Sequence, residues 1–191
     1  MNKTLAVLVV GAGLLPGCAT DFCGDATAPW VQVGKSVFAY EEIVPGEVLT
    51  VQRGSQGAQH VWAGLRARGL HPGSEDIEEG LANDDLPWVE FQLESDEGLH
   101  SFNTRIRLPL DRIEADRLFG LDGRPVQFWH WVERPDDWAT LDMTELEEQL
   151  ETEDFTLRVI IEDACGDTVS DEVAIRLDFP PREDAARGEA G

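Results

Sequence analysis

The sequence predicts an all-β protein folded as a two-sheet sandwich. Apolar residues recur at every second position in several separate segments bounded by glycine, proline or aspartate, which is the pattern of half-buried strands. Helical periodicity is confined to one short segment, and no repeat of about 20–50 residues occurs, so solenoids and propellers are excluded. We therefore expect one sandwich of seven or eight strands with one short helix over residues 35–179.

The expected elements follow in chain order. Two short strands are placed near residues 36–41 and 47–52. Longer alternating strands are expected at His60–Arg68, Trp88–Glu94, Phe102–Leu108, Val126–Val132, Leu157–Ile161 and Val173–Leu177. A helix is expected at Met143–Glu151, where Thr144 can cap the first turn and Glu147 follows three residues later. This helix would lie on the long connection between the fourth and fifth of the longer strands.

The last hairpin resembles the end of bacterial immunoglobulin-like and PKD-like domains. The resemblance rests on the hydrophobic strand that begins at Leu157, the turn Asp163-Ala164-Cys165-Gly166 and the final alternating strand up to Leu177. It implies that the sandwich is immunoglobulin-like. The segment Arg53–Trp62 is similar to a turn and strand of uncharacterised exported bacterial lipoproteins, a class that implies no activity.

The first eighteen residues carry an export signal. Lys3 supplies a positive charge, Leu5–Leu15 is an uncharged and mostly apolar run, and small residues follow. The run is too short to span a bilayer, which takes about 20 apolar residues. The segment Leu15-Pro16-Gly17-Cys18 resembles the lipobox of bacterial lipoproteins, with proline at a place where the family usually has a small residue.

The lipobox resemblance implies a signal peptide at residues 1–17, acylation of Cys18 and a lipid anchor in the cell envelope. The residue after the cysteine is Ala19 and not aspartate, which in many Gram-negative lipoproteins implies the outer membrane. Ordinary secretory cleavage after Ala19 is the alternative, since Gly17 and Ala19 form a small-x-small pair. Both interpretations place the mature chain outside the cytoplasm.

Three cysteines fit an exported protein. If Cys18 is acylated, Cys23 and Cys165 remain as a pair, and disulfides persist in oxidising compartments. The expected Cys23–Cys165 bridge closes a long loop, worth about 4–5 kcal/mol in the chain-entropy model. A metal or redox pair is the alternative, but zinc usually takes four ligands and no Cys-x-x-Cys motif is present. The bridge would join a tether, residues 18–34, to the last hairpin, and residues 180–191 are expected to form a disordered polar tail.

The net charge of −23 argues against nucleic acid as a partner, because phosphate backbones would repel the chain. Calcium binding is left open by the same charge, since hard cations bind oxygen ligands. The acidic clusters lack the Asp-x-Asp-x-Asp-Gly spacing of an EF-hand loop. We therefore assign no metal and no cofactor.

No catalytic residue is assigned either. The four histidines, His60, His71, His100 and His130, form no His-x-His or His-x-x-x-His pair. The segment Gly54-Ser55-Gln56-Gly57 is not a nucleophile elbow. Carboxylates are too frequent in so acidic a chain to single out a glycosidase pair. The sequence therefore predicts a protein that is not an enzyme.

Tryptophans are the best candidates for a binding site. Strand parity places Trp62 opposite the apolar face of its strand, and Trp129 and Trp131 opposite Phe128 and His130. Exposed indoles can stack on sugar rings or anchor a protein interface. The alternative is that the strand around Trp129 is central and buried on both sides.

Together these features predict a lipid-anchored binding or structural module of the envelope, with a protein or glycan partner. The long acidic connections Leu70–Leu86 and Glu133–Asp154 are the loops expected to meet that partner. A glycan-binding or calcium-dependent adhesion domain is the alternative. A hydrolase is the third option, and it would require a concave pocket that holds a histidine beside a carboxylate.

Overall fold

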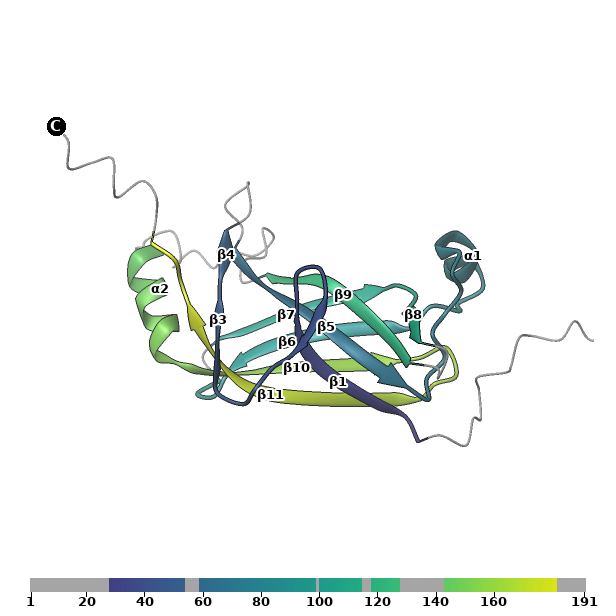
Figure 1. Ribbon diagram of the computed structural model, residues 1–191. Coiled ribbons are helices and arrows are strands. Elements are labelled where there is room, and N and C mark those ends of the chain that lie inside the picture. Colours follow the sequence, from purple (N-terminus) through teal and green to yellow (C-terminus); the bar gives the residue numbers. More distant parts are fainter. Residues whose placement is uncertain (1–27, 54–58, 99, 115–117, 128–142, 182–191) are drawn as a thin grey trace, which may run out of the picture.

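The protein is a two-layer β-sandwich. The computed structural model describes residues 28–53, 59–98, 100–114, 118–127 and 143–181. Within these residues eleven strands form two sheets that pack face to face, and two short helices lie at the periphery (Figure 1). The predicted all-β, two-sheet class is therefore confirmed.

The first sheet, sheet A, contains the beginning of the chain's described part. Its strand order is β2 (Tyr40–Glu42), β1 (Trp30–Ser36), β5 (Gln59–Arg68), β9 (Leu118–Gln127) and β8 (Asp111–Glu114). A two-residue strand, β4 (Gln52–Arg53), also pairs with the start of β5. All the pairings in this sheet are antiparallel.

The second sheet, sheet B, contains the last hairpin. Its order is β3 (Glu47–Thr50), β11 (Thr168–Asp178), β10 (Asp154–Glu162), β6 (Trp88–Ser95) and β7 (Ser101–Arg107). Only the β3–β11 pairing is parallel. The order β1-β5-β9-β8 against β11-β10-β6-β7 matches the two sheets of an immunoglobulin-like sandwich, with the chain's first segment pairing in both sheets.

The core lies where the alternating strands face each other. Val61, Leu65, Phe91, Leu93 and Phe155 are all fully buried, as are the inward residues that follow them along β10. Each such side chain contributes about 1.5–3 kcal/mol of burial free energy. The inward faces of β5, β6 and β10 are therefore those that the two-residue alternation predicts.

The beginning of the sandwich differs from the prediction. One strand was expected near residues 36–41, but residues 37–39 form the bend between β1, which is Trp30–Ser36, and β2, which begins at Tyr40. Val31 and Val33 lie in the core with 4% and 3% of their surface exposed. The predicted tether, residues 18–34, is thus five residues too long at its end, because burial of this valine pair draws the segment from Trp30 into sheet A.

The helices partly match the prediction. Helix α2 (Met143–Thr152) lies where Met143–Glu151 was expected, and it begins one residue before Thr144. Helix α1 (Ile77–Ala82) was not predicted; the Asp76 carboxylate caps it by accepting from the N–H groups of Glu78 and Glu79 at 3.0 Å. Among the described residues no helix is long and apolar enough to cross a membrane.

Strands β8 and β9 show where the alternation pattern fails. The expected strand at Val126–Val132 begins earlier, at Leu118, and its residues beyond Gln127 lie outside the described part. Gly120, Gly123 and Pro125 interrupt the apolar pattern of β9. Gly120 and Pro125 are turn signals in the sequence, yet they pair with Arg66 and Trp62 of β5. Gly123 is an irregularity of the strand, because its φ is +65° and the β5–β9 register shifts beside it.

Candidate functional site

The candidate site arises from an interruption in sheet A. Along one edge, β5 pairs with β1 up to Ala63, opposite Lys35, and with β4 from His60, opposite Gln52. Between these pairings, Val61 and Trp62 have no partner on that edge among the described strands. The reason is that the chain turns back after Ser36 and pairs with the other edge of β1 as β2. It then pairs with β11 in sheet B as β3 and returns to β5 only at Gln52.

This gap opens into a groove with a volume of about 480 Å³. We call it the β5-edge groove. Its lining comes from three segments: residues 35–39 and Glu41 of the β1–β2 hairpin; Leu49, Thr50 and Gln52 of the returning chain; and Val61 and Trp62 of β5. The volume falls within the range of about 300–1,000 Å³ that is typical of small-ligand sites.

The hairpin that forms one wall is braced at its base. The Tyr40 ring packs on Gly34, where a Cβ atom would come within 2.3 Å of it, and the Arg66 guanidinium lies 4.4 Å from the ring centre. Arg66 is held in turn by two hydrogen bonds to the Asp122 carboxylate, at 2.9 and 3.3 Å, and the Ser36 hydroxyl donates to that carboxylate at 3.1 Å. Burial raises the pKa of Tyr40 to about 12.

The tip of this hairpin is apolar and exposed. Phe38 has 95% of its surface in contact with solvent, and Val37 has 49%. An aromatic ring so exposed contributes little to folding, since its burial would be worth about 1.5–3 kcal/mol. The braced base therefore presents an unburied aromatic side chain at the rim of the groove.

A lysine joins the groove wall to the second sheet. The Lys35 ammonium forms an ion pair with Glu47 of β3 and lies 3.4 Å from the Glu41 carboxylate. The hydrogen bond from Lys35 lowers the pKa of Glu47, helped by the N–H of Val44, and the same bond raises the pKa of Lys35. The charge of Lys35 is thus satisfied within the protein.

Of the three predicted binding tryptophans, the structure describes Trp62. It is half-buried on the outer face of β5, as parity predicted, and its ring meets the His60 ring edge to face at 4.8 Å. Trp129 and Trp131 lie outside the described residues, and so does His130. Sequence reasoning missed Phe38, because the apolar pair Val37-Phe38 was taken as part of a short strand near residues 36–41.

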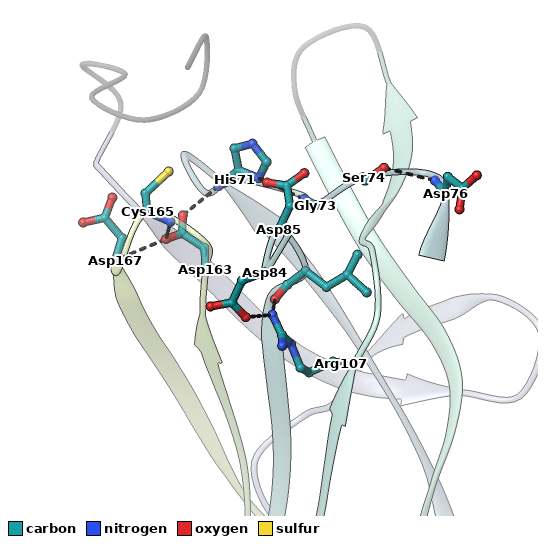
Figure 2. A network of polar contacts seen from close by, with 11 residues as sticks. His71, Gly73, Ser74, Asp76, Asp84, Asp85, Arg107, Asp163, Cys165 and Asp167 are labelled. Carbon is teal, nitrogen blue, oxygen red and sulfur yellow. Dashed lines mark hydrogen bonds and ion pairs between the residues drawn. The ribbon is translucent and has the colours of Figure 1, made fainter. Parts of the chain in front are cut away.

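The opposite end of the sandwich holds a polar network, drawn in Figure 2. The buried Asp163 carboxylate, in the β10–β11 turn, accepts hydrogen bonds from the backbone N–H groups of Cys165 and Asp167, each at 2.9 Å. Its other oxygen accepts from the N–H of His71 at 2.7 Å. We call this the Asp163 network. It joins the last turn to the segment that follows β5.

The loop Leu70–Leu86, expected to meet a partner, is largely anchored to the sandwich. Its two end residues are buried, with 1% and 2% of their surface exposed. The Arg107 guanidinium binds the Asp84 carboxylate and the Leu86 carbonyl. These contacts hold the loop as part of the fold.

Two histidines lie beside carboxylates. His71 Nδ1 accepts from the Gly73 N–H at 3.1 Å and is 3.6 Å from the Asp85 carboxylate, while His100 Nε2 is 3.5 Å from Glu153. None of these residues lines the β5-edge groove. The histidine–carboxylate pocket that the hydrolase option requires is therefore not formed at this groove.

No metal centre emerges from the acidic clusters in the described part of the chain, where no group of three or more His, Cys, Asp or Glu side chains is placed to hold an ion. Glu147, buried on α2, instead binds the Arg53 guanidinium at 3.0 Å and the Gln59 amide. This carboxylate fastens the helix to the strands next to the groove.

Cys165 is disulfide-bonded. The other two cysteines of the chain, Cys18 and Cys23, lie outside the described residues, so the pairing with Cys23 stays a prediction. The acylated position Cys18 and the signal peptide also lie outside them.

No family model matches the chain, and no curated protein matches it.

Proposed function

We propose that the protein is a lipid-anchored binding module of the bacterial cell envelope, held at the outer membrane through Cys18 and without catalytic activity of its own. The observation that carries the proposal is the disulfide at Cys165, together with the export signal of the first eighteen residues. Disulfides form and persist in oxidising compartments, and the periplasm is one of them.

The pairing of the cysteines bears directly on the anchor. Cys165 can bond only to Cys18 or Cys23, the two other cysteines of the chain. A bond to Cys23 leaves the thiol of Cys18 free for acylation, whereas a bond to Cys18 excludes it. Cys23 is seven residues before Trp30, and the start of β1 lies at the same end of the sandwich as the β10–β11 turn (Figure 1).

The position of the groove supports a binding role. The pairing of Trp30 with Arg68 puts the start of β1 near the Asp163 network, while Lys35 and Ser36, at its other end, line the groove. The seven residues of β1 span roughly 20 Å. A chain anchored before β1 therefore carries its groove on the side of the domain away from the anchor.

Intact mass and detergent partition of the full-length protein, expressed in a bacterial envelope, test the anchor. The wild type is expected in the detergent phase with a diacylglyceryl mass on Cys18 and, without reductant, two hydrogens fewer than the dithiol form. Cys18→Ser should become water-soluble and keep the disulfide. Cys23→Ser, the matched control, should keep the lipid and lose the disulfide.

Two results would overturn this proposal. A soluble wild-type species that begins at Thr20 would mean ordinary secretion. A disulfide that survives Cys23→Ser and disappears in Cys18→Ser would mean that Cys18 is bonded to Cys165 and is not acylated.

A further inference from the structure

We infer that the β5-edge groove binds a neutral saccharide, with the flat face of a sugar ring against Trp62 and Phe38. The inference rests on the proposed binding function and names the class of its ligand. It follows from three properties of the groove: the charge of its lining, its aromatic side chains and its backbone polar groups.

The described lining of the groove has equal numbers of acidic and basic residues, although the protein as a whole is strongly acidic. The chain carries 38 acidic and 15 basic residues, yet among the described residues of the lining only Lys35 and Glu41 are charged, and their ammonium and carboxylate groups lie 3.4 Å apart. Lys35 is bound by Glu47 as well. An anionic ligand would be repelled by the net negative charge of the whole protein. A cationic ligand would meet one carboxylate in the described lining, that of Glu41, which already pairs with Lys35. A ligand without charge fits both conditions.

Two aromatic side chains give the groove apolar surfaces of the size of a sugar ring. Trp62 is half-buried in the floor, and Phe38 stands at the rim with 95% exposure. The Tyr40–Arg66 contact and the bond from Ser36 to Asp122 hold the hairpin in place before any ligand arrives. This preorganisation lowers the entropy cost of binding.

Polar groups lie beside these rings. Trp62 is paired on its other side with Pro125, which has no N–H and whose carbonyl accepts from the Thr104 hydroxyl at 3.4 Å. In an antiparallel ladder, a residue that exchanges no hydrogen bonds with one neighbour directs its N–H and C=O to the opposite side. The N–H and C=O of Trp62 therefore face the gap.

Thr50 and Gln52 add a hydroxyl and an amide to the same groove, and both side chains are exposed. Sugar hydroxyls both donate and accept hydrogen bonds, so they can use a backbone N–H, a carbonyl, an amide and a hydroxyl together. The groove therefore combines aromatic side chains with uncharged hydrogen-bond donors and acceptors. A sugar ring has the matching surfaces, an apolar face and an edge that bears hydroxyl groups.

Titration of the full-length protein with neutral sugars tests this inference. The protein is purified in a detergent without a sugar headgroup and titrated with hexasaccharides of α-1,4-glucose, β-1,4-glucose and N-acetylglucosamine, while the indole N–H signals of its six tryptophans are followed by NMR. At least one hexasaccharide should shift the Trp62 signal and leave the Trp30 signal in place, since Trp30 lies at the far end of β1.

Three variants locate the contact. Phe38→Ala removes a side chain that is 95% exposed and should weaken binding roughly two- to tenfold without loss of folding. Gln52→Ala should weaken it by a similar factor. Trp30→Phe, the control for an exposed tryptophan outside the groove, should bind like the wild type.

The outcomes separate this inference from the proposed function. No shift at Trp62 with any of the three sugars at 10 mM, or shifts confined to other tryptophans, would overturn the saccharide site and leave the lipid anchor untouched. Binding of a lysine-rich peptide at Trp62 in place of the sugars would assign the groove to a protein partner. Failure of the cysteine experiment alone would remove the anchor and leave the sugar site standing.

Discussion

The sandwich is completed differently at the two ends of β1. At its start, the sandwich is closed by the Asp163 network, in which a buried carboxylate accepts three backbone hydrogen bonds. At its other end strand pairing stops, and the chain leaves Phe38 and half of Val37 in solvent. At the first end, polar groups complete the fold. At the other end, apolar side chains are exposed and no described strand pairs with this edge of β5 at Val61 and Trp62.

This difference distinguishes polar groups that stabilise the fold from polar groups that are available to a ligand. Both oxygens of the buried Asp163 carboxylate accept hydrogen bonds from backbone N–H groups of the chain. In the groove, Lys35 is paired with carboxylates of the protein, and the side chains of Thr50 and Gln52 are neutral and exposed. A buried carboxylate that is hydrogen-bonded within the chain therefore stabilises the fold. An exposed aromatic side chain beside a gap in a sheet indicates a binding surface.

Asp163→Ala should give the largest effect. The substitution leaves three backbone N–H groups without their acceptor, and a buried donor without a partner costs about 1–3 kcal/mol. We expect a loss of about 3 kcal/mol or more in the free energy of unfolding, measured by urea denaturation. Asp163→Asn keeps one carbonyl oxygen and should recover part of the loss. Equal stability of wild type and Asp163→Ala would show that the network does not close this end.

Gly34→Ala should have an intermediate effect and act at the groove. A Cβ atom at this position would lie 2.3 Å from the Tyr40 ring and 2.5 Å from the carbonyl oxygen of Glu41, so β2 must move away from β1. Such overpacking costs about 1–3 kcal/mol. Urea denaturation should show this loss, and the Trp62 indole signal should shift because the groove wall is displaced.

The control for that variant is Gln32→Ala, a substitution on the same strand and outside the groove lining. It should change stability by less than about 0.5 kcal/mol. A Gly34→Ala protein with wild-type stability and an unmoved Trp62 signal would contradict the packing described for the hairpin.

The smallest effect is expected from the Lys35–Glu47 ion pair and should depend on pH. The pKa of Glu47 is lowered in the folded protein, so its contribution to stability is present above the ordinary glutamate pKa of about 4.5 and is lost as the pH falls through the lowered value. Glu47→Gln should cost less than about 1 kcal/mol at pH 7, because both side chains are partly exposed. The difference from wild type, followed by thermal unfolding, should shrink as the pH falls below about 4.5. A difference that is constant with pH would assign the effect to packing and not to charge.

The sequence by itself determined the strands that lie in the middle of the sheets. Val89, Phe91 and Leu93 alternate without a break, and so do Leu157, Val159 and Ile161; all six are fully buried. The two-residue period is a local property of the chain, and burial on one side of a sheet follows from it directly. Helix α2 was also predicted from a local pattern, the spacing of Thr144 and Glu147.

Local patterns could not give the elements that depend on distant contacts. Glu147 has the position of a capping residue in the sequence, yet its carboxylate binds Arg53, which is 94 residues away along the chain. Trp30–Gly34 resembled a tether, because only its place beside β5 makes it a strand.

The groove itself was decided by tertiary structure alone. Trp62 could be identified as a candidate from its parity on β5, but its neighbours Phe38 and Gln52 come from segments that leave β5 and return to it. The gap exists because one stretch of chain pairs first with sheet A, then with sheet B, and then with sheet A again. Whether a residue has a neighbouring strand depends on the register of the whole sheet. A local pattern of side chains therefore cannot predict the gap beside Val61 and Trp62.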